Sequence, residues 1–382
     1  MLIADTGIRE FEEEDLPGVA ELHRRVMTPN AAADVAWLPT YRKYFRDVFL
    51  SDAALRAGLP SLVYQREGRI LGFLGVMPRR MQFHGTPLLA AVCSQFVVDP
   101  AERGQAGLQM LKRCFAGDQD LSITDEAADC TRKIWEWCGG TTALPYSMHW
   151  IRPLRPAQAA LPRFLSPLAR AVDAIATKAT GRFRSAPPLG SREALDEETL
   201  LGCLTDVSSR CAIGPSYDAT SVRWVLARAH RHADRGTVRA LAVKDESHAI
   251  IGWCIYHARR GGRGEVFQIA AQPRQHRDVF DHLIDDAWQQ GVTVLSGRFE
   301  PAFAPQLSEH GCLVYRRGYW TLVHSKRPEL CHALQRGDAF FTRLEGEWCL
   351  RLSPEEARPL LDDYRTEEPG PFQPARERQV TT

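Results

Sequence analysis

The chain has 382 residues, of which 44% are hydrophobic and 25% charged, and its net charge is +1 at neutral pH. This length and composition suggest a globular protein of two to three domains, since a single ordinary core serves a shorter chain. The near-neutral charge gives no argument for a nucleic-acid partner.

Targeting and membrane-spanning patterns are absent from the sequence. Residues 1–10 lack a basic region followed by an apolar run, and no segment has the roughly 18 uninterrupted apolar residues of a spanning helix. The ten cysteines are scattered, and no two form a Cys-x-x-Cys pair. This spacing argues for reduced thiols and against a zinc site or a disulfide framework. We therefore expect a cytoplasmic protein that holds no metal.

Residues 1–150 predict strands that alternate with helices. The expected elements are strand 8–11, helices 15–26, 41–50 and 52–57, strands 61–65, 70–76, 81–84 and 88–98, helix 107–115, strand 121–124, helix 125–138 and a strand from 141. Glu67-Gly68 marks a hairpin turn between two of these strands. Such an order is found in many α/β folds, so it is weak evidence by itself.

The segment 93–112 is more specific. It reads as an apolar strand, a short turn with an arginine and two glycines, and then a helix. That order places free backbone N–H groups and the positive end of a helix dipole at one point, where phosphate oxygens can bind. The alternative is an ordinary strand-to-helix turn without a ligand.

The same residues resemble the acyl-CoA-binding motif of the GNAT superfamily of N-acetyltransferases. The match is Val98-Asp99-Pro100 followed by Arg103-Gly104-Gln105-Ala106-Gly107-Leu108. The resemblance implies that the N–H groups of residues 103–108, with the charge of Arg103, hold the pyrophosphate of acetyl-CoA or another acyl-CoA. It also implies that the backbone of Phe96, Val97 and Val98 pairs with the pantetheine arm, as an added strand would. Ala106 and Leu108 depart from the family's small residues, and Gly107 is displaced by one position.

A second resemblance covers residues 123–140, which look like the family's strand, acidic turn and helix. The family's general-acid tyrosine corresponds to Trp135 here, and an indole has no proton to give at these pH values. The catalytic residues are therefore unknown, with Tyr146 and His149 on the next strand as weak candidates. Cys93 could act as an acyl-carrying nucleophile, but a buried structural thiol is the simpler expectation.

Residues 151–190 differ in composition from the rest of the chain. They contain six prolines and seven Lys or Arg side chains against one acid, which gives a local charge of +6. Leu165, Leu168, Val172 and Ile175 share one helical face. We expect a linker helix whose apolar stripe packs on a domain, and the alternative is weak contact with an anionic membrane.

The chain then repeats the order of its first half. Residues 191–350 predict a second acetyltransferase-like domain, followed by a polar tail at 351–382. Its counterpart of the phosphate turn, residues 271–278, contains no glycine, so we expect this half to be degenerate. His230 and His232 could be a metal pair, but a solvated cluster is the preferred interpretation.

We therefore expect an α/β (α+β) chain with two mixed-sheet, acetyltransferase-like domains in tandem, the first of which binds acyl-CoA. The function that the resemblance implies is transfer of an acyl group to an amine or hydroxyl. The acceptor stays open among small molecules, saccharides and peptides. The alternatives are an inactive binding module of the same fold and an aminoacyl transferase of the FemABX type.

Overall fold

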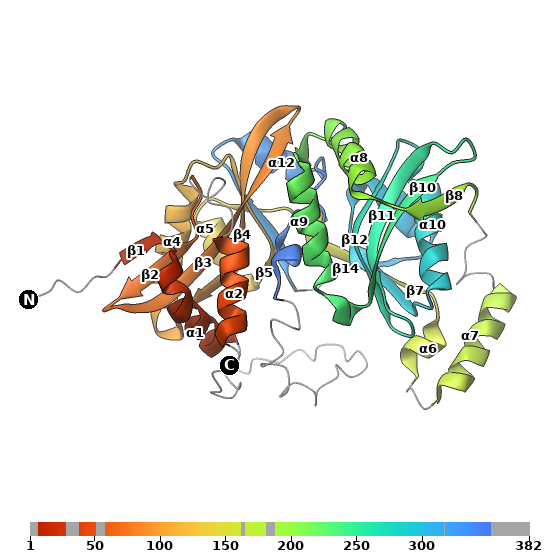
Figure 1. Cartoon of the computed structure of the whole chain (residues 1–382), viewed down its shortest axis with the longest axis horizontal. Helices are drawn as coiled ribbons and strands as arrows, with labels where there is room; N and C mark the ends of the chain where they lie inside the picture. Colours follow the sequence, from red (N-terminus) through yellow and green to blue (C-terminus); the bar gives the residue numbers. More distant parts are fainter. Residues whose placement is uncertain are drawn as a thin grey trace, which may run out of the picture.

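The computed structural model describes residues 7–27, 38–50, 58–161, 165–180, 188–316 and 318–352. They form two mixed β-sheets with helices packed against them, arranged along the long axis of the molecule (Figure 1). The predicted α/β class with two mixed-sheet units is confirmed. The expected helix at 52–57 and all but the first two residues of the tail lie outside the described residues.

Sheet A has the strand order β1-β2-β3-β4-β5-β15-β6, with β9 beside β3. Its strands are β1 (Gly7–Glu10), β2 (Leu62–Arg66), β3 (Arg69–Phe83), β4 (Thr86–Val98), β5 (Leu121–Ala127), β6 (Thr141–Thr142), β9 (Ile213–Pro215) and β15 (Trp320–His324). The pair β4–β5 is parallel and the other pairs are antiparallel.

The predicted hairpin between β2 and β3 is confirmed. Glu67 and Gly68 have φ of 53° and 73°, the positive values that a two-residue hairpin turn needs. The strands expected at 70–76 and 81–84 are instead one continuous strand, β3, which runs through Pro78. Pro78 lies beyond the last residue that pairs with β2 and before the first that pairs with β9, so its missing N–H leaves no ladder bond unmade on that side.

Sheet B has the order β14-β7-β13-β12-β11-β10-β8. Its strands are β7 (Met148–Pro153), β8 (Ser191–Ala194), β10 (Thr237–Lys244), β11 (Ile250–Ala258), β12 (Arg263–Ala271), β13 (Val294–Arg298) and β14 (Leu313–Arg316). Again only one pair, β12–β13, is parallel. The two sheets therefore share one pattern of strand directions.

The two halves of the chain exchange a strand. β7 follows the first half in sequence, yet it lies in sheet B between β13 and β14. β15 follows the second half, yet it lies in sheet A between β5 and β6. The expected domain boundary at residue 150 thus falls inside β7. Sheet B is complete only with β7 of the first half, and sheet A only with β15 of the second half, which also adds β9 beside β3.

Helices cover both faces of each sheet. They are α1 (Leu16–Met27), α2 (Leu38–Phe49), α4 (Gln105–Phe115), α5 (Asp129–Trp137), α6 (Pro156–Ala160), α7 (Ser166–Thr180), α8 (Glu197–Ser209), α9 (Ala219–His230), α10 (His276–Gln289), α11 (Ala304–Glu309) and α12 (Pro328–Gln335). α1 and α2 pack on one face of sheet A, and α4 and α5 on the other. The core beneath α1 and α2 is continuous with side chains of the second half such as Trp253 and Phe267.

The last described residues, 339–352, run between the two halves and include the short 3-10 helix η8 (Glu347–Leu350). We call residues 339–352 the C-terminal segment. Most of its side chains are buried, among them Phe341, Trp348 and Leu350. It therefore belongs to the core that joins the halves.

The apolar stripe of α7 does not pack as expected. Leu168, Val172 and Ile175 are 57%, 45% and 69% exposed. The helix instead turns Ala169 and Asp173 inward, and the Asp173 carboxylate accepts hydrogen bonds from the N–H groups of Ala157 and Gln158 at the start of α6. That contact holds α7 against α6 and leaves the stripe in solvent.

Candidate functional site

The turn after β4 is built to leave backbone N–H groups free. Asp99 caps a short 3-10 turn by accepting a hydrogen bond from the N–H of Ala101, and Gly104, with φ of 101°, then begins α4. Among the described residues we find no acceptor for the N–H groups of residues 105–107. Four such groups are left over at every helix start, and here they meet the positive end of the helix dipole.

The charges around this turn favour an anion. Asp99 is paired with Arg25 at 2.7 Å, and Glu102 with Arg66 at 2.7 Å. Arg103 is exposed and has no ion-pair partner in the described part of the chain. The acids of the turn are thus neutralised while one arginine remains for a ligand.

Ala106 and Gly107, at which the sequence departs from the family motif, lie in the first turns of α4. Ala106 is buried in the first turn of α4, where a negative φ suits alanine. A Cβ added at Gly107 would be at ordinary contact distance from Phe96 (3.5 Å) and Val98 (3.7 Å). Gly104 is the residue of this turn whose backbone angle requires glycine.

A bulge in β4 lies just before the turn. The register of β3 and β4 shifts between Phe73 and Gly75, and Gln95 on the opposite strand has φ of 53°. Its side chain is fixed by its neighbours: His23 Nε2 lies 2.7 Å from Gln95 Oε1, and Gln95 Nε2 donates to the Tyr44 hydroxyl at 3.0 Å. Tyr44 in turn donates to the carbonyl of Leu350 at 2.5 Å.

Beyond the bulge, β4 and β5 separate. They pair only from Ala90–Val92 to Leu121–Ile123, which leaves a gap between them that we call the β4–β5 gap. The N–H of Asp99 bonds to Leu71 of β3. Because neighbouring residues of a strand point their backbone groups in opposite directions, those of Phe96 and Val98 face the gap. Of the three residues expected to pair with pantetheine, Phe96 and Val98 thus turn their backbone groups to the gap, whereas those of Val97 face β3.

Glu347 of the C-terminal segment closes the inner end of the gap, where η8 contacts both β4 and β5. Its carboxylate accepts hydrogen bonds from the Thr124 hydroxyl (2.8 Å) and from the N–H groups of Asp125 (3.1 Å) and Glu126 (2.8 Å). Burial, together with the carboxylates of Asp125 and Glu126, raises the pKa of Glu347 well above its usual range. A carboxyl of raised pKa at this point is able to take up a proton.

Three side chains considered from the sequence are part of the core. Trp135 is 1% exposed and packs edge-to-face on Phe115 with ring centroids 4.9 Å apart. The Tyr146 hydroxyl donates to the carbonyl of Ala339 (2.7 Å) and accepts from the N–H of the same residue (3.0 Å), and burial raises its pKa. Cys93 is 2% exposed, and its contact with Cys114, Sγ to Sγ 3.8 Å, followed by burial, raises its pKa. These positions argue for structural roles.

The histidines considered from the sequence have different surroundings. His149 is half-buried on β7, faces Arg343 with its Nδ1 at 3.2 Å, and lines a cavity between the two halves. His230 is exposed at the end of α9. The interpretation of His232 as part of a solvated cluster is wrong, because it is 1% exposed with its ring beside Trp348.

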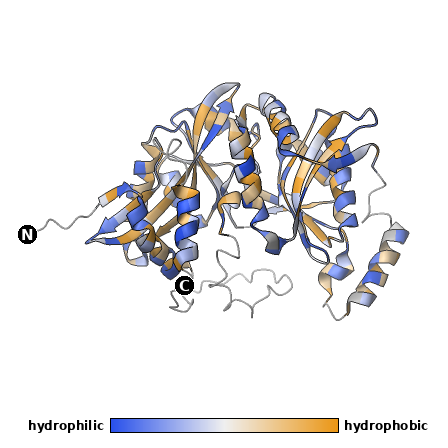
Figure 2. Cartoon of the chain, in the orientation of Figure 1, coloured by the Kyte–Doolittle hydropathy of each residue, from blue (hydrophilic) through white to orange (hydrophobic). Residues whose placement is uncertain are grey.

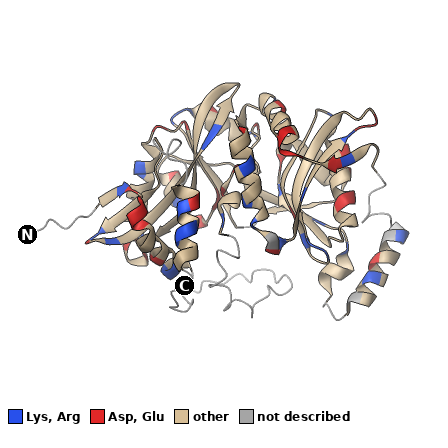
Figure 3. Ribbon diagram, in the orientation of Figure 1, with Lys and Arg blue, Asp and Glu red and all other residues tan. Residues whose placement is uncertain are grey.

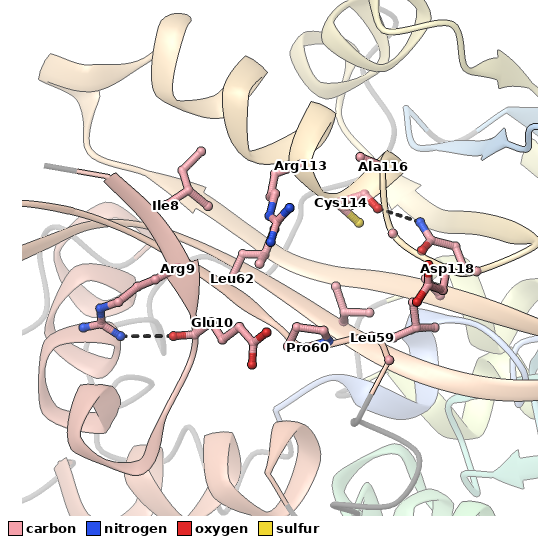
Figure 4. Close-up of a pocket in the computed structure, with 15 residues that line it drawn as sticks. Ile8, Arg9, Glu10, Leu59, Pro60, Leu62, Arg113, Cys114, Ala116 and Asp118 are labelled. Atoms are coloured by element: carbon pink, nitrogen blue, oxygen red, sulfur yellow. Dashed lines mark hydrogen bonds between the residues drawn. The ribbon is translucent and has the colours of Figure 1, made fainter.

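A second cavity, of about 530 Å³, lies at the other end of α4. Figure 4 shows Arg113, Cys114 and Ala116 from the end of this helix facing Ile8 and Leu62 across it. The end of a helix carries the negative part of the dipole, which disfavours phosphate. This cavity is therefore separate from the turn at residues 103–108.

The matching gap in sheet B is occupied by the chain itself. β12 and β13 pair through residues 263–266, and beyond them the N–H of Arg343 bonds to the carbonyl of Phe267 at 3.2 Å. The Gln268 side chain reaches Glu345 at 3.2 Å. The C-terminal segment thus takes the place that an extended ligand would need in this half.

Two findings concern the described residues as a whole. No group of three or more His, Cys, Asp or Glu side chains among them is arranged to hold a metal ion. No helix in the same ranges combines the length and the apolar composition needed to cross a bilayer.

Comparison with known proteins agrees with this geometry. The family model of the acetyltransferase (GNAT) domain matches residues 7–118. Among solved structures, a GCN5-related N-acetyltransferase from Anabaena variabilis has a TM-score of 0.56 at 11% identity, covering 85% of this chain and 73% of that one. A probable N-acyltransferase from Enterococcus faecalis has a TM-score of 0.54 at 12% identity, with the same coverage. No curated protein sequence matches. At these identities the structural likeness speaks for the fold.

Proposed function

We propose that residues 7–118, which match the family model of the acetyltransferase (GNAT) domain, bind acyl-CoA, and that the protein transfers an acetyl or related acyl group to an amine or hydroxyl of an acceptor. One observation carries the proposal. At the start of α4, N–H groups and Arg103 have no partner among the described residues, and this turn directly follows a bulged strand with backbone groups that face the β4–β5 gap. Such a turn suits a pyrophosphate, and such a strand edge suits the amides of pantetheine.

Only the first half binds acyl-CoA in this proposal. Its turn has the required glycine and free N–H groups, whereas the gap of sheet B is filled by Arg343 and its neighbours. The second half shapes the acceptor side and supplies β15 to sheet A.

We further propose Glu347 as the general base. It is a buried carboxyl at the inner end of the gap, and burial beside the carboxylates of Asp125 and Glu126 raises its pKa. Glu347→Gln keeps an acceptor oxygen for the N–H groups of Asp125 and Glu126. The expected result is a loss of turnover with CoA affinity unchanged.

Calorimetric titration with CoA tests the cofactor assignment. Arg103→Ala combined with Gly104→Asp removes a phosphate contact and adds a negative charge, and one charge-assisted contact is worth about 1.5–3 kcal/mol. Arg113→Ala, at the far end of the same helix, is the matched control. Binding that is absent in the wild type, or equally strong in the double variant, would refute the proposal.

Two other functions are separated by simple assays. An inactive binding module would bind CoA but release no free thiol with any acceptor in a broad amine and alcohol series. An aminoacyl transferase of the FemABX type would bind tRNA with a steep dependence on salt.

The exposed stripe of α7 favours a contact with an anionic membrane surface. Figure 2 shows apolar positions on this helix, which projects from the second half, and Figure 3 shows basic positions on it. Arg170 and Lys178 are exposed beside Leu168 and Ile175. The attraction would be about 1 kcal/mol for each engaged charge.

Liposome flotation tests this contact. We expect flotation with phosphatidylglycerol vesicles at low salt, and its loss at high salt or in a Leu168→Ser, Ile175→Ser double variant. Leu313→Ser, an equally exposed leucine on β14, should behave as the wild type. Flotation with vesicles made only of neutral phosphatidylcholine would contradict the electrostatic contribution to the contact. The absence of flotation with either lipid would contradict the contact itself.

A further inference from the structure

A charged cavity of about 540 Å³ lies between the two halves. One of its walls is the end of β5, where Asp125 and Glu126 bind Glu347 through their N–H groups. The opposite wall comes from β12 and from the C-terminal segment. The cavity therefore lies beside the inner end of the β4–β5 gap, and the end of β5 forms a wall of both. Its volume suits a small molecule.

The guanidinium groups of this cavity outnumber the carboxylates that can neutralise them. Glu265 is shared by two arginines, Arg235 at 2.6 Å and the closely paired Arg343. Burial raises the pKa of Glu265, but these two charges outweigh it and hold the pKa well below its usual range. One carboxylate thus serves two cations, and about one positive charge is left over.

The remaining acids of the cavity are each paired with an arginine of their own. Glu126 is paired with Arg351. Asp125 is paired with Arg298 at 2.6 Å, and both side chains of this pair are 3% exposed or less. Neither carboxylate is left to neutralise a second cation in the cavity.

Arg263 adds an uncompensated charge. It is exposed at the start of β12, two residues before Glu265, so both side chains lie on the same face of the strand. Among the described residues Arg263 has no ion-pair partner. A guanidinium of this kind is well suited to a planar carboxylate or a phosphate, because its fork of N–H donors matches two oxygens at once.

We propose that this cavity binds the acceptor, and that the acceptor carries a carboxylate or phosphate in addition to the amine or hydroxyl that receives the acyl group. Arg263 and the pair Arg235–Arg343 hold the anionic group, while the nucleophile points toward the β4–β5 gap. A polycationic amine is disfavoured, because it would meet the surplus of positive charge. This inference rests on the proposed acyl transfer.

Matched probes test the proposal by equilibrium binding to the full-length protein. Phosphoethanolamine is compared with ethanolamine, and γ-aminobutyrate with 1,4-diaminobutane, by calorimetry with and without saturating CoA. The member of each pair that carries a phosphate or carboxylate should bind about 10-fold more tightly. Arg263→Gln should abolish this preference, and Arg260→Gln, an exposed arginine in the preceding turn outside the cavity, should keep it.

The outcomes separate this inference from the function on which it rests. Without CoA binding in the same preparation, the proposed function fails and the acceptor assignment fails with it. If the protein binds CoA but binds ethanolamine and 1,4-diaminobutane as tightly as their matched partners or more tightly, the acceptor assignment alone is overturned. The same holds if it binds CoA and none of the four probes. If Arg263→Gln still prefers phosphoethanolamine and γ-aminobutyrate over their matched partners, the role of this cavity is overturned.

Discussion

The two glycines of the phosphate turn should respond to alanine in opposite ways. Gly104 has φ of 101° and ψ of −82°, which the Cβ of an L-residue strongly disfavours, and Gly104→Ala should cost about 1–3 kcal/mol of folding stability. Gly107 lies in the first turns of α4, where alanine is about 1 kcal/mol better than glycine. Its new methyl group would meet Phe96 and Val98 at ordinary contact distances. Gly107→Ala should therefore be neutral or stabilising.

Urea denaturation, followed by tryptophan fluorescence and circular dichroism together, measures both changes. The difference between the two variants should be about 2 kcal/mol or more, with Gly104→Ala the less stable. Equal stabilities, or a less stable Gly107→Ala, would refute the backbone argument.

CoA titration of the same two proteins gives an independent readout. A Cβ at Gly104 meets no atom within 4 Å apart from its own chain neighbours, so it would stand in open space at the start of α4, next to the N–H groups of residues 105–107. A Cβ at Gly107 points back to β4. CoA affinity should therefore fall in Gly104→Ala and persist in Gly107→Ala. The opposite pattern would mean that the phosphates approach α4 from another side.

Two further predictions concern buried charges. Arg298→Met leaves the buried Asp125 carboxylate without its ion-pair partner and should lower the free energy of unfolding, measured by urea denaturation, by about 3–5 kcal/mol. Arg327→Met breaks an exposed pair with Glu329 and should lower it by less than about 1 kcal/mol. Similar losses in the two variants would contradict the role of burial. Burial lowers the pKa of His23 to about 4, so the unfolded chain takes up its proton first and stability should fall as the pH drops from 6.5 toward 4, by up to about 3 kcal/mol. His23→Gln should reduce this slope between denaturation curves at pH 7 and 4.5, and an unchanged slope would assign it to other groups.

Local chemistry explains what the sequence predicted well. The hairpin at Glu67-Gly68 depends on backbone angles that only a few residues accept, and it is confirmed. A helix follows the phosphate turn as expected, but α4 begins at Gln105 after the N-cap Gly104, two residues before the expected start at 107. A strand-turn-helix with such residues is recognisable without its surroundings.

Long-range chemistry explains what the sequence did not predict. Glu347 is separated from the Thr124 hydroxyl by 223 positions, and Arg298 from Asp125 by 173. Neither lies in a motif, so nothing local points to its partner. The stripe of α7 shows the same limit, since its periodicity predicts an apolar face but not what covers it. The exchange of β7 and β15 likewise follows from strand edges that pair only in three dimensions.

The strand exchange also limits how the halves can act. Sheet A without β15 would expose the backbone edge of β5 next to the proposed catalytic gap, and an exposed edge of this kind invites pairing with other chains. The C-terminal segment adds a second dependence, because it fills the gap of sheet B with Arg343 and closes the inner end of the β4–β5 gap with Glu347. A shift of this segment would alter both gaps at once. The second half is therefore a structural requirement for the first, although residues 271–278, which the sequence predicted to correspond to the phosphate turn, contain no glycine.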